Sequence, residues 1–174
     1  MKFEVLFGRL AAVLLCVAIA TGAAARELRH PVRGEPAFTV QVPDNWTHEV
    51  DSDDNLIVVS QDRSASLVFS LGTFSGSLED AAKKMLQVAD ATAPTGKMPA
   101  SISGQSGFSV DSTMRNAKGH LLQLKLTIVR IGARGYGTAT KIEVPGILPE
   151  QRQLADTVMQ TVQIVGAPAP TGGR

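Results

Sequence analysis

Cysteine is almost missing from this sequence, whose 174 residues include one, Cys16. It lies inside an apolar stretch, residues 10–20, that we interpret as part of an export signal. The residues before it lack the small side chain that lipoprotein processing requires, so lipidation is not expected. Without Cys16 the mature chain has no thiol, which excludes disulfides, thiolate metal sites and cysteine catalysis. Its stability must then come from a hydrophobic core.

A charge surplus is also missing, and aromatic residues are few. Of the 17 basic and 16 acidic residues, two basic and one acidic residue precede position 26, which leaves 15 of each sign in the mature chain. With one Trp and one Tyr, the sequence has no basic, aromatic-rich surface for nucleic acid. It also has no polybasic cluster for anionic lipid. We therefore expect no nucleic-acid partner.

The first 25 residues have the order of a secretory signal peptide. Lys2 and Arg9 form a basic start, the apolar stretch follows, and Ala23 and Ala25 complete an A-x-A cleavage pattern. We predict cleavage after Ala25 and an exported protein, periplasmic or secreted. A retained anchor is the alternative, but 16 residues separate Arg9 from Arg26, whereas a membrane-spanning helix needs about 20. No membrane span is expected after cleavage.

The 149 residues that follow the predicted cleavage site are enough for one domain with a sizeable core. Residues 26–36 are charged and contain two prolines, so they are expected to be an exposed lead-in. Residues 166–174 are rich in Gly and Pro and are expected to be a disordered tail. This leaves residues 37–165 as a single domain.

Hydrophobic periodicity predicts strands interrupted by one helix and closed by another. Short apolar runs, most of them alternating with polar residues, predict strands at residues 38–42, 56–60, 66–71, 107–114, 120–129 and 136–143. The connections are short and have turn composition, including a type I turn at residues 116–119. Strands joined in this way are expected to form an antiparallel sheet.

Two segments carry the apolar stripe of an amphipathic helix, residues 77–90 and 149–162. Ser77 and Asp80 are placed to cap the first, and Pro149 stands at a first helical position of the second. Ion pairs one turn apart are expected for Glu79–Lys83 and Asp80–Lys84. The apolar stripes of these helices must be buried against the sheet, either on opposite faces or both on the same face. The predicted fold class is therefore α+β, an antiparallel sheet packed with two helices.

The stretch "FTVQVPDNWTHEV", residues 38–50, contains the single tryptophan, Trp46. We interpret Trp46 as a residue that closes the core where the first predicted strand ends. A stacking or partner-contacting Trp is the alternative. His48 is expected on the same strand face, but a lone histidine without a partner is not a catalytic base.

The acidic stretch "DSDDN" matches the start of a calcium-binding loop. Asp51, Asp53 and Asn55 stand at loop positions 1, 3 and 5, and Asp62 at position 12. However, position 6 is Leu56 instead of the glycine that the sharp turn requires. We therefore expect a hairpin loop solvated by aspartates and no calcium site.

Other motifs that could support chemistry fail on spacing. "GQSGF", residues 104–108, is not G-x-S-x-G and indicates a tight turn. "GARGYG", residues 132–137, lies between strands and does not open a helix that could bind phosphate. The histidines are far apart in the sequence, at positions 30, 48 and 120. We therefore assign no catalytic, cofactor-binding or metal-binding residue, and no partner-contact residue.

The order of these elements resembles the PsbP-like fold. The matching features are the "F-x-V-x-V-P-x-x-W" opening at residues 38–46, the "SLEDAAKKML" helix, the "SGQSG" turn and the closing helix. The resemblance covers residues 35–165 and implies an α/β/α sandwich, shared by the photosystem II protein PsbP, a Ran-binding nuclear-import factor and bacterial exported proteins of the DcrB type. The absence of a lipobox and of a plastid-type leader favours the bacterial exported branch. The group has no common active site, so the resemblance implies a partner-binding or accessory domain.

Two functions of different class follow. The preferred hypothesis is an exported, non-enzymatic accessory protein with no cofactor, which binds a protein partner in the cell envelope. The alternative is a small-ligand binder or weak hydrolase that uses a pocket between sheet and helix. That alternative requires convergent polar groups beside an apolar cavity, which the sequence does not show. A structural role in the envelope is a third possibility.

Overall fold

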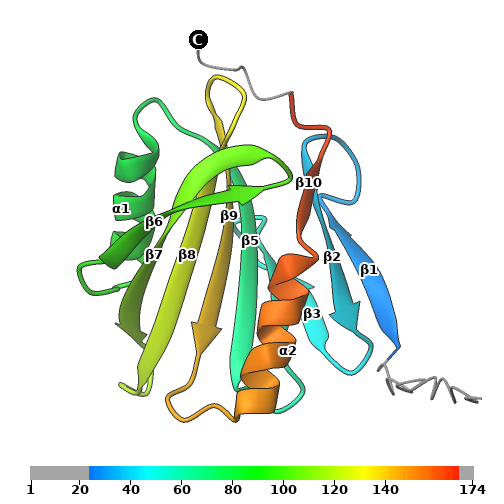
Figure 1. The fold of residues 1–174 in the computed structure, drawn as a ribbon, viewed down its shortest axis with the longest axis vertical. Coiled ribbons are helices and arrows are strands. Elements are labelled where there is room, and N and C mark those ends of the chain that lie inside the picture. The colour runs from blue at the N-terminus through cyan, green and yellow to red at the C-terminus, as the bar shows by residue number, and fades with distance from the viewer. Residues whose placement is uncertain (1–23, 169–174) are drawn as a thin grey trace, which may run out of the picture.

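The computed structural model describes residues 24–168. Ten strands in this range form two antiparallel sheets, and two helices pack against them (Figure 1). The smaller sheet has the order β1 (Ala25–His30), β2 (Ala37–Pro43), β10 (Gln163–Val165). The larger sheet has the order β3 (Thr47–Val50), β4 (Leu56–Val59), β5 (Ala65–Thr73), β9 (Gly135–Glu143), β8 (Leu121–Ile131), β7 (Gln105–Arg115), β6 (Thr95–Ile102). The α+β prediction is confirmed.

The two helices, α1 (Leu78–Val88) and α2 (Pro149–Gln160), cover opposite faces of the larger sheet (Figure 1). Along β8, Leu126 and Ile128 point into the core under α1, whereas Val129 and Ile131 belong to the core on the other side. That second core is shared by α2 and the smaller sheet. The molecule is thus the expected α/β/α sandwich, with the smaller sheet beside α2. Neither of the helices in residues 24–168 is long and apolar enough to cross a membrane.

Local sequence explains where the helices begin. Ser77 and Asp80 form the predicted capping box, in which the Ser77 hydroxyl accepts from the Asp80 amide and the Asp80 carboxylate accepts from Ser77. Pro149 stands in the first turn of α2. The predicted ion pairs with Lys83 and Lys84 are wrong, because Glu79 pairs with Lys97 of β6 and Asp80 is engaged by the cap.

The expected lead-in is wrong for residues 26–30, which form most of β1 and pair with β2. The Arg26 guanidinium donates hydrogen bonds to the carbonyls of Asp44 and Trp46, so this charged group is engaged at the edge of the smaller sheet. His30 at the end of the strand is buried. β1 forms because its backbone pairs with β2. Its charged side chains do not alternate regularly with apolar ones, so the sequence shows no strand pattern there.

The first predicted strand is correct in position but does not join the main sheet. β2 pairs with β1 and β10, and its alternating Phe38, Val40 and Val42 pack onto the core under α2. β3, β6 and β10 were also not predicted. β3 and most of β6 are exposed and lack an apolar face, and β10 has three residues. Such strands depend on a neighbouring edge to pair with.

Turn chemistry fixes the register of the long hairpins. The predicted turn at residues 116–119 is confirmed, because the Gly119 amide donates to the Asn116 carbonyl at 2.8 Å. The turn predicted in "SGQSG" and "GQSGF" is formed by Ser103 and Gly104 alone, and the residues from Gln105 onward belong to β7. The φ values of Ser103 and Gly104, 51° and 77°, are those of a two-residue type I′ hairpin between β6 and β7. Gly107 is then inside β7, where a Cβ would lie 1.9 Å from the Ile128 carbonyl oxygen.

Two turn carboxylates make stability depend on pH. Asp51 accepts from the side chain and amide of Asn55, and these hydrogen bonds hold its pKa below the usual value. Burial raises the pKa of Asp62, but the hydrogen bonds that it accepts from Ser60 and Ser64 outweigh burial and lower it. Both carboxyls therefore take up protons less readily in the folded chain than in the unfolded chain.

We expect the free energy of unfolding to decrease as the pH falls from about 5 to about 2, because the unfolded chain binds protons first over this range. Asp62→Asn should make that decrease shallower, measured by urea unfolding at several pH values. Asp53→Asn is the matched control, since the Asp53 carboxylate accepts no hydrogen bond within the described chain. An unchanged slope in Asp62→Asn would contradict the assignment.

Candidate functional site

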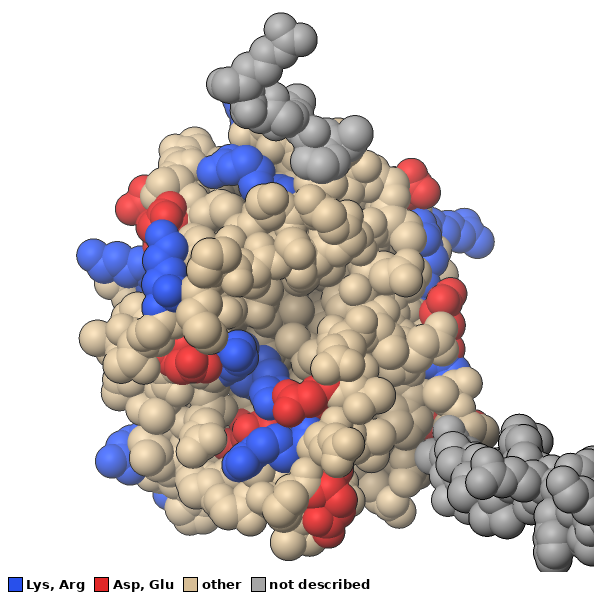
Figure 2. Space-filling model, viewed as in Figure 1, with Lys and Arg blue, Asp and Glu red and all other residues tan. Residues whose placement is uncertain are grey.

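The face of the larger sheet that carries α2 is only partly covered. α2 packs on β2, β5 and β9, and beyond it lie two adjoining hollows of about 530 and 610 Å³. Both hollows are lined by Lys125 and Lys141, and we call them together the sheet groove. Figure 2 shows this face hollowed at its centre, with basic and acidic side chains along the lower border of the hollow.

The groove has its shape because β6 curls over the sheet. The pairing of β6 with β7 shifts register between Thr95 and Met98, an irregularity of the kind that bends a strand. The β6–β7 hairpin then reaches the smaller sheet, where the Ile164 amide donates to Ser103 Oγ at 2.8 Å and Gln105 Nε2 donates to the Pro168 carbonyl at 2.9 Å. These contacts join the two sheets across one end of the groove.

Small residues make the groove deep. Ser109, Thr127 and Ala139 stand opposite one another on β7, β8 and β9 and line the hollow of about 530 Å³. The next row on the same face holds Asp111, Lys125 and Lys141, in the same strand order. Because these three side chains are small, they leave room for a ligand. The bottom of that space is formed by the Ser109 and Thr127 hydroxyls and the Ala139 methyl group. The charged row forms one side of that space.

Four residues form a charge cluster between β9 and α2: Lys141 and Glu143, which are buried, and Arg152 and Asp156, which are partly exposed. Lys141 Nζ lies 2.9 Å from Glu143 Oε1 and 2.5 Å from Asp156 Oδ1, and Arg152 Nε lies 3.5 Å from Glu143 Oε2. The side chains of Lys141 and Glu143 are 11% and 7% exposed. Burial lowers the pKa of Lys141, but the hydrogen bond to Asp156 and the nearby Glu143 carboxylate outweigh burial and raise it. Lys141 therefore stays ionised, and its ion pair with Asp156 attaches α2 to the sheet.

Lys125 differs from Lys141 although the two are direct cross-strand neighbours. No carboxylate within residues 24–168 lies inside 4 Å of its ammonium group, and Asp111 opposite it on β7 forms no ion pair. Its side chain is partly buried and lines both halves of the groove. The groove thus contains a cation whose charge the described chain leaves uncompensated.

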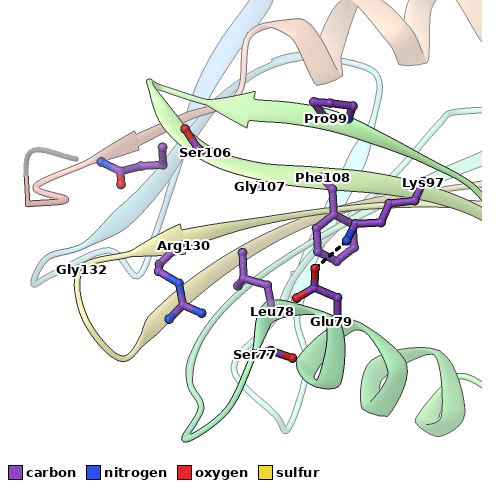
Figure 3. A pocket seen from close by; sticks show the side chains of 11 residues that line it. Ser77, Leu78, Glu79, Lys97, Pro99, Ser106, Gly107, Phe108, Arg130 and Gly132 are labelled. Carbon is purple, nitrogen blue, oxygen red and sulfur yellow. Dashed lines mark hydrogen bonds and ion pairs between the residues drawn. The ribbon is translucent and has the colours of Figure 1, made fainter. Parts of the chain in front are cut away.

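A separate hollow of about 670 Å³, the hairpin pocket, lies between the start of α1, the β6–β7 hairpin and the end of β8 (Figure 3). Its cations are already engaged. Lys97 pairs with Glu79 and lies 4.4 Å from the centre of the Phe108 ring, and Arg130 donates to the Ala133 carbonyl at 3.3 Å. The capping box satisfies the start of α1. This pocket is therefore less suited to a charged ligand than the sheet groove.

The structure places Trp46, the three histidines and the acidic stretch away from the sheet groove and the hairpin pocket. Of the other sequence motifs, "GQSGF" and the first glycine of "GARGYG" contribute to the lining of the hairpin pocket. Trp46 is 2% exposed and lies in the core under α2, which confirms its interpretation as a core residue. His48 is exposed on β3, with Nδ1 3.4 Å from Arg26 Nη2. His30 lies at the end of β1, with Nε2 2.7 Å from the Asp54 carbonyl oxygen, and His120 is exposed after the β7–β8 turn. The three histidines therefore do not form one site.

The calcium-loop pattern is not assembled either. Asp51 closes its own turn, since Oδ1 accepts from the amides of Asp53 and Asn55, each at 2.9 Å. Asp62 lies beyond the far end of β4 and closes the next turn. Within the described range, no group of three His, Cys, Asp or Glu side chains is placed to hold a metal ion.

The residues of the sheet groove are not among the candidates that the sequence predicts. The segment "HLLQLKLTIV" was interpreted through its leucines, which face α1, while Lys125 and Thr127 on the alternate positions line the groove. A signal was present, since polar residues also occupy the alternate positions of the two neighbouring strands. Only the strand order brings these polar positions onto one face beside α2.

Comparison with solved structures identifies the class of fold. The chain is similar to LpqN, described as involved in cell envelope biogenesis of Mycobacterium tuberculosis, with a TM-score of 0.55 and 15% identity over 83% of this chain and 92% of LpqN. It is also similar to cyanobacterial PsbP from Synechocystis sp. PCC 6803, with a TM-score of 0.55 and 11% identity over 86% of this chain and 96% of that protein. The PsbP-like fold predicted from the order of elements is thus confirmed. No protein-family model and no curated protein matches the sequence.

Proposed function

We propose that this protein is an exported, non-enzymatic accessory protein that binds a partner of the cell envelope through the sheet groove. The observation that carries the proposal is the groove itself, a hollow built on three paired strands and walled by β6 and α2. Its charge cluster is neutralised internally, an arrangement that suits positioning and recognition better than proton transfer. The similarity to LpqN, a protein involved in cell envelope biogenesis, supports the envelope as its place of action.

Export is the second part of the proposal. Cleavage after Ala25 would remove one residue of β1 and keep five of its six pairs with β2, from Arg26 to His30. A mature chain that begins at Arg26 therefore retains nearly the whole sheet edge. The intact mass of the protein recovered from the periplasm or medium tests this proposal. A mass that still includes residues 1–25 would contradict cleavage.

Site-specific photo-crosslinking in cells tests the use of the groove. A benzoylphenylalanine at Gln160 or Ser101, on opposite walls of the groove, should capture one dominant envelope protein. The same group at Lys84, an exposed residue of α1 on the other face, is the matched control and should capture none. Equal capture from both faces, or none from the groove positions in a correctly exported protein, would contradict the proposal.

The groove also favours the second function, small-ligand binding. Polar groups from β7, β8, β9 and α2 converge beside the apolar side chains of Ile102, Met159 and Val162. This combination is what the alternative hypothesis required, and it arises only in the folded chain. Its volume of about 530 Å³ is within the range of small-molecule sites.

A further inference from the structure

We propose that Lys125, Ser109 and Thr127 form a subsite for an oxyanion with a single negative charge, a carboxylate or a phosphodiester, carried by a small ligand in the sheet groove. The inference rests on the proposed use of this groove as a binding site. It assigns the class of ligand and the residues that recognise its charged end.

The position of Lys125 provides the cation. Three cations line the groove, but Lys141 has two carboxylate partners and Arg152 has one. Lys125 has none within 4 Å in the part of the chain that the structure describes. An ammonium group in a partly enclosed hollow is stabilised most by an oxyanion that makes charge-assisted hydrogen bonds to it. The ligand would supply the oxyanion that pairs with the Lys125 ammonium group.

Ser109 and Thr127 provide neutral hydrogen bonds beside that cation. Thr127 is two residues from Lys125 on β8, so the two side chains are on the same face of the sheet. Ser109 is the direct cross-strand partner of Thr127 on β7. Neither hydroxyl takes part in a hydrogen bond within residues 24–168, although Ser109 is 5% exposed. Both residues line the hollow, so each hydroxyl is free to donate a hydrogen bond to an acceptor bound there.

The surroundings limit the ligand to one negative charge. Asp111 stands opposite Lys125 on β7, and Asp156 of the charge cluster lines the same hollow. These carboxylates would repel a second negative charge. Apart from Lys141, whose charge is paired with Glu143 and Asp156, the remaining walls of this hollow are apolar or neutral, including Ile102, Val162 and Gln160. The body of the ligand is therefore uncharged and lies along the row of small residues.

The test is a titration of the ¹⁵N-labelled mature protein by NMR at constant ionic strength. Acetate and dimethyl phosphate serve as probes of the two oxyanions, and sulfate serves as the dianion. We expect saturable shifts of the amides of residues 109, 125 and 127 with the monoanions. Lys125→Met should weaken binding at least ten-fold, and Thr127→Val should weaken it several-fold while keeping the shape of the side chain.

Lys118→Met, in the exposed β7–β8 turn, is the charge-matched control and should leave the titration unchanged. Shifts of equal size at Lys118 and Lys125, an unaltered titration in Lys125→Met, or tighter binding of sulfate would each overturn the subsite. A groove that captures an envelope protein by crosslinking but shows no saturable shift overturns the subsite and not the proposed function. Anion binding without any crosslinked protein supports the subsite and contradicts the protein partner.

Discussion

Replacing Lys141 with methionine is expected to lower the free energy of unfolding by about 3 kcal/mol, because within residues 24–168 it leaves the buried Glu143 carboxylate paired with Arg152 alone. Methionine matches the length of the lysine stem, so the change removes the charge with little loss of packing. Glu143 is 7% exposed and cannot regain its hydration in the folded chain. Urea unfolding of the variant and the wild type measures the difference.

Two further variants make this prediction specific to the charge cluster. Adding Glu143→Gln to Lys141→Met should recover part of the lost stability, since the unpaired buried charge is then removed. Lys125→Met changes the neighbouring lysine on the same sheet face and should cost less than about 1 kcal/mol, because no ion pair is broken. If Lys141→Met and Lys125→Met cost the same, the cluster does not hold α2 to the sheet.

Truncation of Trp46 to alanine is expected to destabilise the protein by about 3 to 5 kcal/mol, because the indole is buried in the core under α2. Trp46→Phe keeps much of the apolar volume and should cost clearly less. Val32→Ala is the exposed control, at 76% exposure, and should change stability little. The unfolding midpoint in urea, followed by circular dichroism, measures all three.

The same series distinguishes the two interpretations of Trp46. If Trp46→Phe folds as the wild type does and still captures the envelope partner from Gln160, the residue is structural. Loss of capture by a well-folded Trp46→Phe would instead make Trp46 part of the interface. The burial of the side chain predicts the first result, since a residue 2% exposed offers little surface to a partner.

Together these variants separate stability from recognition on one face of the sheet. Lys141 and Lys125 are neighbours in the same row, but the first is expected to act through α2 and the second through a ligand. Lys141→Met should therefore change unfolding strongly, whereas Lys125→Met should change anion binding strongly and unfolding little.

Much of this fold could be predicted from local sequence. The capping box at Ser77, the turn at residues 116–119 and the alternating strands of the long hairpins depend on interactions between residues close in the chain. The burial of Trp46 follows from the size and apolar character of its indole. Local hydrogen bonding and side-chain periodicity act within one segment, so they can be recognised in the sequence.

The tertiary structure decided the remainder. β1 and β6 are strands because an edge of β2 or β7 lies beside them, and neither has an apolar pattern of its own. Lys141 meets Asp156 only where α2 crosses β9, and Lys125 lies between Asp111 and Lys141 on the groove face only because of the strand order. The physical reason is that pairing and charge compensation depend on distances between segments far apart in the chain, and folding alone sets those distances.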